Sequence, residues 1–439
     1  MDKILLKGGE VASSLGVELA DVLIEDGVIK EVGANLSIDG AEVIDCSGRV
    51  VMPGAIDVHV HFREPGGEEK EDFNSGSKAA VSGGVTTVFD MPNNNPPILS
   101  CDDLEMKRGL INGRSYCNYG LYIGYNGENV EEINAAEGIA GVKVYCAHST
   151  GNMGIEGDGY LEKAFTEIDR SKKLLFHAED EDIIEKNYKK FVEGRKKVAV
   201  FTHSKVRSKE AAVKMTTELC ELAKKHERPI HICHVSTGEE LEIISEYREY
   251  GVTCEVAPHH LVFSTADYDS MGSFIKMNPP VRSGKDLFAL WKGLQEGLVD
   301  IIATDHAPHT REEKEKGGFN APSGVPGVEM MIPIMLNAVD MQSVSLEEVV
   351  YLCCERPADI FGISKKGKVE AGFDADIVVV DLEKQKNLKN SDVVSKCGWT
   401  PYAGGLYKGW PVLTMISGEI VWDKGKFIEG CKGSEVVFS

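Results

Sequence analysis

Two histidines, one residue apart, stand at the end of an apolar run. His59 and His61 follow the segment Ile56-Asp57-Val58. Side chains two residues apart in a strand point to the same face, so both imidazoles can reach a single metal ion. The solvated face of an ordinary strand would explain an isolated pair of this kind equally well. The preceding residues, Val51 to Ala55, are apolar and turn-like, which favours a buried location and therefore a metal site.

A lysine lies inside another apolar strand pattern. Lys143 stands between Val142 and Val144, where an unpaired ammonium group is costly. Burial can lower the pKa of a lysine far enough to leave a neutral amine at neutral pH. Such an amine can add carbon dioxide and become a carbamate, an anionic ligand that bridges two cations. A lysine that extends from an edge strand into solvent is the alternative, and residue chemistry alone leaves both readings open.

Three further apolar runs end in side chains that can bind a metal or move a proton. His177 and His234 each end such a run, and Asp305 closes the run that begins at Ile301. A carboxylate at a strand end can ligate a metal and also shuttle a proton. Nitrogen and oxygen ligands suit zinc or, less selectively, manganese or cobalt. The resulting set of candidate ligands is His59, His61, Lys143, His177, His234 and Asp305.

The remaining histidines are weaker candidates. His231 lies three residues before His234 and faces the opposite side of a regular strand, so we expect it to be a packed residue. His203 and His226 lie in polar, helix-like segments and are expected at the surface.

Strand and helix patterns alternate through the middle of the chain. Alternation over about three hundred residues predicts a (β/α)8 barrel of the TIM type, in which functional residues lie at the C-terminal ends of the strands. A doubly wound open sheet is the alternative, but no GxGxxG sequence follows a strand pattern. Strand patterns cover residues 85–90, 141–145, 174–177, 230–234, 253–256 and 301–305, and helical patterns include 74–82 and 208–225.

Both ends of the chain carry short β patterns. Asp26-Gly27 separates two apolar runs and is a strong hairpin signal, and Ala375–Asp381 and Val412–Trp422 also indicate strands. Chain ends often lie close together, so we expect one composite β-sandwich domain. The predicted division places residues 1–52 and 365–439 in this sandwich and residues 53–364 in the barrel.

Composition narrows the class of protein. The 439 residues carry a formal net charge of -22, which argues against a nucleic-acid-binding or anionic-membrane surface. There is no apolar run long enough for a membrane span, and the N-terminus lacks a secretory signal pattern. The 11 cysteines are scattered without a CxxC pair, so neither a disulfide framework nor a cysteine-rich zinc site is indicated, and we expect a cytoplasmic location.

On these residues the chain resembles the amidohydrolase superfamily over essentially its whole length. The histidine pair, the strand lysine, two later strand-end histidines and a final aspartate match the binuclear metal centre of that superfamily. The resemblance implies that one zinc ion (Zn2+) is held by His59, His61 and Asp305 and a second by His177 and His234. It also implies that a carboxylated Lys143 and a hydroxide bridge the two ions.

The flanking motifs resemble those of dihydroorotases. The segment His61-Phe62-Arg63-Glu64-Pro65-Gly66 is similar to the dihydroorotase signature. At the position of Arg63, allantoinases typically have Asn. Further similar segments are Gly83–Thr87, Met91–Asn94, Lys276–Pro280 and Ala303–His309. The family implies the reversible cyclisation of N-carbamoyl-L-aspartate to L-dihydroorotate in de novo pyrimidine (UMP) biosynthesis, with Asp305 as the general acid and base.

The resemblance also implies a set of substrate contacts. Arg63 offers a planar donor fork for the substrate carboxylate. Asn93 and His309 would add hydrogen bonds to the same group, and Asn278 would contact the ring. The composition of the loop from Cys146 to Gly159, rich in Gly, Ser, Thr and Asn, leads us to expect a lid that closes over the substrate, with Ser149 or Thr150 touching the carboxylate. An idle flexible loop is the alternative.

Three alternatives remain open. Many type I bacterial dihydroorotases use a loop aspartate as the bridging ligand, which makes Asp158 the alternative to Lys143. An allantoinase or hydantoinase-type ring opener would keep the metal site, but its substrates lack the ring carboxylate that Arg63 would bind. A non-catalytic scaffold for a partner such as aspartate transcarbamoylase is disfavoured by the complete ligand set. Association with that enzyme, or a homo-oligomer, is compatible with activity.

Overall fold

The computed structural model describes residues 3–148, 153–155, 159–430 and 433–438. The proposed lid residues Ser149 and Thr150, and the alternative ligand Asp158, lie outside the described residues.

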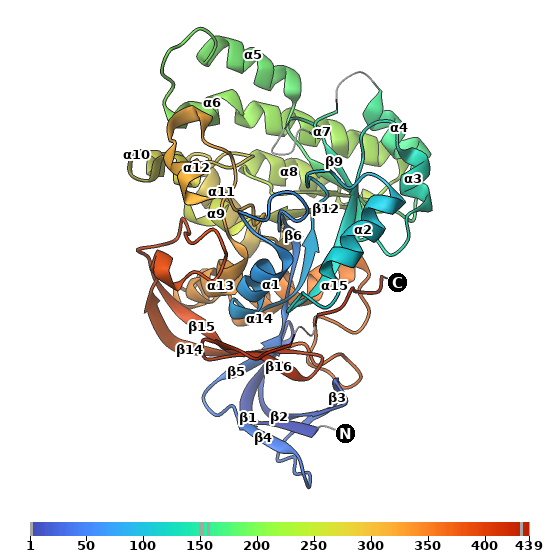
Figure 1. Ribbon diagram of the computed structural model, residues 1–439, viewed down its shortest axis with the longest axis vertical. Helices are drawn as coiled ribbons and strands as arrows, with labels where there is room; N and C mark the ends of the chain where they lie inside the picture. The colour runs from blue at the N-terminus through green and yellow to red at the C-terminus, as the bar shows by residue number, and fades with distance from the viewer. Residues whose placement is uncertain (1–2, 149–152, 156–158, 431–432, 439) are drawn as a thin grey trace.

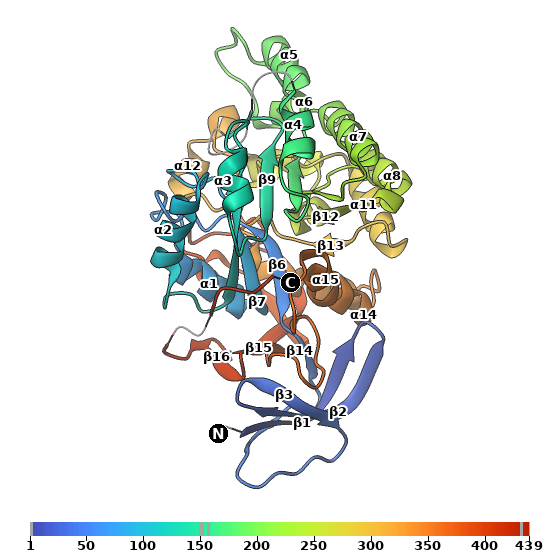
Figure 2. The same ribbon diagram turned by 90° about the vertical axis from the view of Figure 1, so that its right-hand side faces the viewer.

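Eight parallel strands form the central sheet of the molecule, in sequence order around the ring (Figures 1 and 2). The ring closes where Val60 pairs with His306, and the His61 N–H donates to the His306 carbonyl at 2.8 Å. This confirms the predicted barrel. The strands are β6 (Ala55–Val60), β7 (Val85–Asp90), β8 (Asn118–Gly124), β9 (Gly141–Tyr145), β10 (Leu174–His177), β11 (Ile230–Ile232), β12 (Val252–Val256) and β13 (Ile301–Ile302).

Helices cover the outside of this barrel (Figure 2). Helix α7 shows why: its buried residues recur every three to four positions, as in Met215, Leu219 and Ala223, so one face packs inward. The helices are α1 (Phe73–Ser82), α2 (Cys101–Ile111), α3 (Val130–Ala135), α4 (Tyr160–Glu167), α5 (Glu181–Phe191), α6 (His203–Val206), α7 (Lys209–His226), α8 (Gly238–Glu246), α9 (Pro258–Val262), α10 (Tyr268–Met271), α11 (Gly284–Gln295), α12 (Arg311–Glu315), α13 (Met331–Asp340), α14 (Leu346–Val350) and α15 (Arg356–Phe361). None of these helices, within the described ranges, is long and apolar enough to cross a membrane.

The two ends of the chain pair into a second, separate sheet below the barrel (Figure 1). β5 joins the halves: it lies beside β1 on one edge and antiparallel to β14 on the other. Strands from both ends bury one shared apolar cluster, which includes Val22, Val379 and Met415. The strands are β1 (Lys3–Ser13), β2 (Gly16–Glu25), β3 (Val28–Gly33), β4 (Glu42–Asp45), β5 (Val50–Pro53), β14 (Ile377–Asn387), β15 (Leu406–Ile416), β16 (Glu419–Asp423) and β17 (Lys426–Phe427). The boundaries at residues 52 and 365 stay a prediction.

Three candidate site residues lie where the chain leaves the barrel strands with unusual backbone angles. Arg63, His234 and Asp305 have φ values of 62°, 39° and 47°. This left-handed region is uncommon for residues other than glycine, and such residues concentrate at functional sites. β11 ends at Ile232 and β13 at Ile302, so both strands stop before His234 and Asp305, to which the sequence patterns predicted they would extend.

Candidate metal centre

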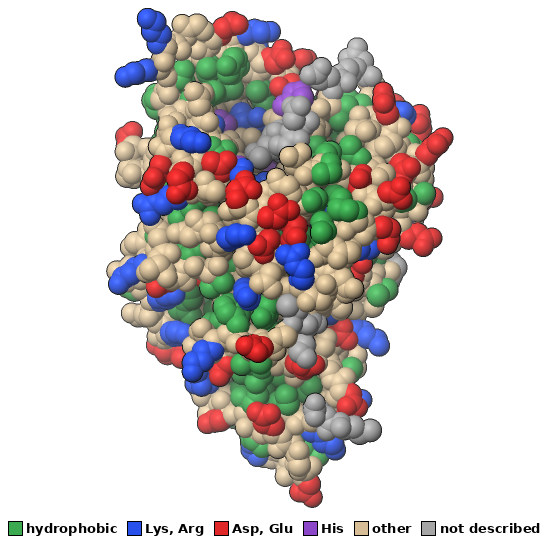
Figure 3. Space-filling view, in the orientation of Figure 1, with side chains coloured by type: hydrophobic (Ala, Val, Ile, Leu, Met, Phe, Trp, Pro, Cys, Tyr) green, Lys and Arg blue, Asp and Glu red, His purple; other side chains and the backbone are tan. Residues whose placement is uncertain are grey.

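A cavity opens at the C-terminal ends of the barrel strands. Figure 3 shows a hollow in the upper part of the molecule, with Lys or Arg side chains (blue) and His side chains (purple) visible inside it. Polar and titratable groups make up most of the cavity wall. Its lining residues are His59, His61, Arg63, Asn93, Tyr145, His177, His234, Asn278, Asp305, Ala307, Ser323 and Gly324.

Two sets of ligand atoms converge in this cavity. Asp305 Oδ1 lies 2.9 Å from His61 Nε2 and 3.4 Å from His59 Nε2. Beside this set, His177 Nδ1 and His234 Nε2 face one another at 3.0 Å. The sets adjoin, because the ring centroids of His59 and His234 are 5.2 Å apart. The first set could hold a metal ion through three ligands, and the second offers two imidazole nitrogens to a neighbouring ion.

Hydrogen bonds to the outer nitrogens orient three of these imidazoles. His59 Nδ1 bonds Glu255, His61 Nδ1 lies 2.6 Å from Asn93 Oδ1, and His177 Nε2 lies 2.8 Å from Glu179 Oε2. The outer nitrogen donates its proton to an oxygen in each pair, which leaves the lone pair of the inner nitrogen free for a metal.

Burial sets the protonation states that metal binding requires. It lowers the pKa of His59 to about 4, and it lowers the pKa of His177 and His234 as well. Burial alone would raise the pKa of Asp305, but the neighbouring His59 and His61 hold it below its ordinary value. Neutral imidazoles beside an ionised carboxylate are the forms that ligate divalent cations.

Lys143 lies under this cavity in the middle of β9. Its side chain is fully buried, and Nζ donates to Cys233 Sγ at 2.9 Å and lies 5.3 Å from the Tyr145 ring centre. Within the described ranges, no carboxylate forms an ion pair with this amine. A fully buried lysine needs compensation from its surroundings, which metal ions bound to a carboxylated amine would supply.

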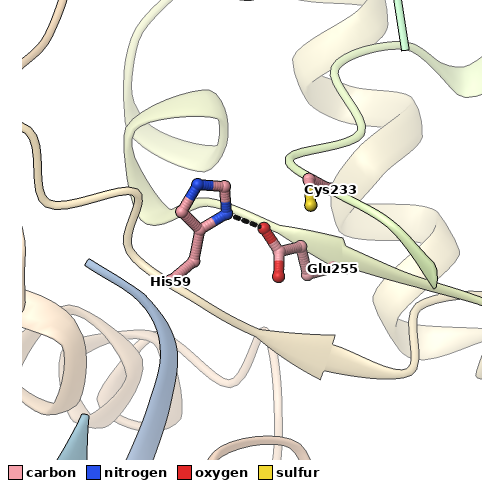
Figure 4. Close-up of side chains that lie close together, drawn as sticks. All are labelled: His59, Cys233 and Glu255. Atoms are coloured by element: carbon pink, nitrogen blue, oxygen red, sulfur yellow. Dashed lines mark hydrogen bonds and ion pairs between the residues drawn. The ribbon is translucent and has the colours of Figure 1, made fainter. Parts of the chain in front are cut away.

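A further group of possible metal ligands shares His59 with the His59, His61 and Asp305 set. His59, Cys233 and Glu255 contribute atoms that all lie within 4.8 Å of one another (Figure 4). Glu255 also accepts from His231 Nε2 at 3.2 Å and from the His234 N–H at 3.1 Å. One buried carboxylate therefore supports two histidines of the centre.

The proposed substrate contacts lie at the rim of the same cavity. Arg63 is 8% exposed, and its Nε donates to the Pro308 carbonyl at 3.1 Å. His309 does not line the cavity; it lies behind Arg63, 3.4 Å from Nη2, and burial lowers its pKa to about 3. Asn278 lines the cavity, and its Oδ1 lies 2.9 Å from His203 Nε2. The structure thus brings Arg63, Asn93 and Asn278 to the cavity and places His309 as a support for Arg63.

A comparison with protein families shows to which family a chain with this arrangement belongs. The Amidohydrolase family matches residues 50–421. The chain belongs to this family. Because the match covers the whole barrel, all the candidate metal ligands of this amidohydrolase lie within the matched residues.

Known proteins similar to this amidohydrolase fall into two groups. A Methanosarcina mazei protein named dihydroorotase is 36% identical over 98% of both chains, and a Bacillus cytotoxicus protein of the same name is 35% identical over 96% of this chain and 98% of the relative. Among solved structures, an L-hydantoinase (dihydropyrimidinase) from Arthrobacter aurescens has a TM-score of 0.95 at 31% identity, covering both chains fully. A dihydropyrimidinase from Brevibacillus agri has a TM-score of 0.92 at 25% identity, covering 100% of this chain and 99% of that one.

Some histidines of this amidohydrolase differ from the sequence prediction. His203 was predicted at the surface, but it is buried. Its Nε2 bonds the Met277 carbonyl at 2.9 Å, and this contact ties the loop that contains Asn278 to α6. His226 is only partly exposed, since it pairs with Glu162 at 3.0 Å. His231 is fully buried, as expected of a packed residue.

Sequence reasoning missed Glu255. The signal was present, because this glutamate stands between Cys254 and Val256 inside an apolar strand, where a carboxylate needs partners. Glu179 contacts His177, and Cys233 contacts Lys143. The sequence held no comparable signal for these two contacts.

Replacing Glu255 with Gln should weaken metal binding by this amidohydrolase about 10- to 100-fold, because a neutral amide supports the His59 N–H less well than a carboxylate. Competition with a coloured chelator measures this affinity. Glu329→Gln is the control: Glu329 is a half-buried carboxylate that accepts from the Val394 N–H, away from the cavity. Equal metal affinity in both variants would contradict the role of Glu255.

Proposed function

We propose that this amidohydrolase is a dihydroorotase, which interconverts N-carbamoyl-L-aspartate and L-dihydroorotate in pyrimidine synthesis. The observation that carries the proposal is the position of Arg63 in the same cavity as the metal ligands. L-Dihydroorotate is a cyclic amide with a carboxylate on its ring. A guanidinium group beside a hydrolytic metal centre fits that pair of features. Relatives named dihydroorotase at 35–36% identity over nearly the full length support the same reading.

The residues fit a pair of zinc ions. We assign one ion to His59, His61 and Asp305 and the other to His177 and His234, with a carboxylated Lys143 between them. The support is the convergence of the His59 and His61 nitrogens on the Asp305 carboxylate and the facing nitrogens of His177 and His234, together with a buried amine beneath them. When bound, such ions would polarise the amide carbonyl and lower the pKa of water.

Asp305 is positioned to move the proton of the reaction. Its carboxylate is buried at the floor of the cavity and ionised at neutral pH, so it can accept a proton from the attacking water. The same group then delivers this proton to the amide nitrogen that leaves the ring carbonyl. In ring closure Asp305 removes a proton from the carbamoyl nitrogen, and the steps run in reverse.

Arg63 is held in place for binding. The Pro308 carbonyl and the His309 ring fix its Nε and Nη2 sides, so the guanidinium plane is oriented before substrate arrives. Such preorganisation reduces the entropy lost on binding. Asp90 supports the same loop, because its carboxylate accepts from the Phe62 N–H at 2.7 Å.

Hydantoin or dihydropyrimidine hydrolysis is the second candidate function. It is favoured by the TM-scores of 0.95 and 0.92 to solved structures of an L-hydantoinase (dihydropyrimidinase) and a dihydropyrimidinase. Arg63 discriminates between the two functions, because a ring without a carboxylate gives this buried cation no partner.

Replacing Arg63 with Lys should lower kcat/KM for L-dihydroorotate about 100-fold, since lysine keeps the charge but loses the bidentate fork. Turnover of an uncharged ring such as dihydrouracil should not fall. Steady-state kinetics on both substrates measures this difference.

Arg228→Lys is the control for loss of a buried guanidinium. Arg228 is 2% exposed and bonds the carbonyls of Phe165 and Ile168 far from the cavity wall. Unchanged kcat/KM for dihydroorotate in Arg63→Lys would reject the proposed role and favour the hydantoinase alternative.

A further inference from the structure

Tyr145 ends β9 two residues after Lys143, so both side chains point into the barrel. Tyr145 lies one layer closer to the open end and is 3% exposed. Its ring packs beside the His177 ring, with centroids 6.1 Å apart, and it forms part of the cavity wall. The side chain therefore reaches the space where a substrate would lie.

The Tyr145 hydroxyl is buried and has no hydrogen-bond partner among the residues that the structure describes. Buried phenols normally find a partner. Tyr122, on the neighbouring strand β8, shows the ordinary case, since its hydroxyl donates to the Val58 carbonyl at 2.9 Å. A phenol hydroxyl is protonated at neutral pH, so this group can donate a hydrogen bond.

Arg63 offers a second donor beside this hydroxyl. The two groups interact electrostatically, and both line the same cavity. Arg63 Nε and Nη2 have protein partners, whereas no partner is recorded for Nη1 within the described part of the chain. A buried phenol without a hydrogen-bond partner and a guanidinium that line the same cavity are suited to a bound anion.

We propose that the Tyr145 hydroxyl donates a hydrogen bond to the ring carboxylate of the substrate, beside the Arg63 guanidinium, and so helps select anionic rings. This inference rests on the proposed dihydroorotase function and deepens it. Because a site built to hydrogen-bond a substrate group rejects analogues that lack the group, Tyr145 would be a specificity-determining residue.

Tyr145→Phe tests the inference, since it removes one oxygen atom and keeps the ring that packs on His177. We expect kcat/KM for L-dihydroorotate to fall about 10- to 100-fold, as for loss of a charge-assisted hydrogen bond, mainly through a higher KM. For the uncharged amide of dihydroorotate, kcat/KM should not change. Bound metal and the thermal unfolding midpoint should match the wild-type protein.

Tyr122→Phe is the matched control, and it should not alter the ratio of kcat/KM between the acid and its amide. An equal loss for acid and amide in Tyr145→Phe, or no loss for either, would overturn the inference. Absence of dihydroorotate turnover in the wild-type protein would overturn the proposed function as well. Wild-type turnover with an unchanged ratio in Tyr145→Phe would overturn the Tyr145 inference alone.

Discussion

Asp305→Asn should lower turnover in both directions by at least about 10³-fold, because the substitution removes both the proton carrier and a charged metal ligand. Asn cannot accept a proton from water at neutral pH. Its amide oxygen is also a weaker ligand than the carboxylate that contacts His59 and His61. Initial rates with L-dihydroorotate and with N-carbamoyl-L-aspartate measure the loss.

Asp300→Asn is the control for this variant. Asp300 is also a buried strand-flanking aspartate, but it accepts from the Cys254 N–H and from Arg356, outside the cavity. Substantial activity in Asp305→Asn, with metal still bound, would show that another group moves the proton.

Lys143→Arg should remove most of the activity, by at least about 10³-fold, and leave fewer than two metal ions per chain. Arginine keeps a positive charge in the barrel but cannot carry the carbamate that we assign to Lys143. Metal analysis of the purified variant, with and without added bicarbonate, measures the effect. Intact-mass measurement of the wild-type protein under native conditions should detect the carbon dioxide adduct.

Retention of both metal ions and of activity in Lys143→Arg would contradict the bridging role. In that case Lys143 would be a buried cation that serves packing, and the bridging ligand would have to come from elsewhere, such as Asp158. Bicarbonate should leave the variant unchanged but should increase the activity of wild-type protein that has been depleted of carbon dioxide.

The fold was predictable because the signals for it are local. Alternating strand and helix patterns such as 141–145 and 208–225 correspond closely to β9 and α7. The candidate ligands were predictable for a related reason, because a barrel brings the ends of all its strands to one rim. Lys143 and Asp305, far apart in sequence, therefore meet at one cavity.

Features that depend on neighbouring strands could not be read from the sequence. Glu255 orients His59 only because the closed barrel brings β12 near β6, and no local pattern specifies that contact. His203 was misjudged because its helix-like segment is polar, yet the segment folds over the Asn278 loop and buries the ring. The contact of His309 with Arg63 likewise depends on loop packing, and its contact with substrate stays a prediction.

The most direct test of the account is a substrate comparison combined with metal analysis on the wild-type protein. Purified protein would be given L-dihydroorotate, allantoin, hydantoin and dihydrouracil in turn, while bound zinc is counted. The account predicts about two metal ions per chain and turnover of dihydroorotate far above that of the uncharged rings. Turnover of an uncharged ring alone would contradict it, and so would the absence of both metal and activity after zinc and bicarbonate are added.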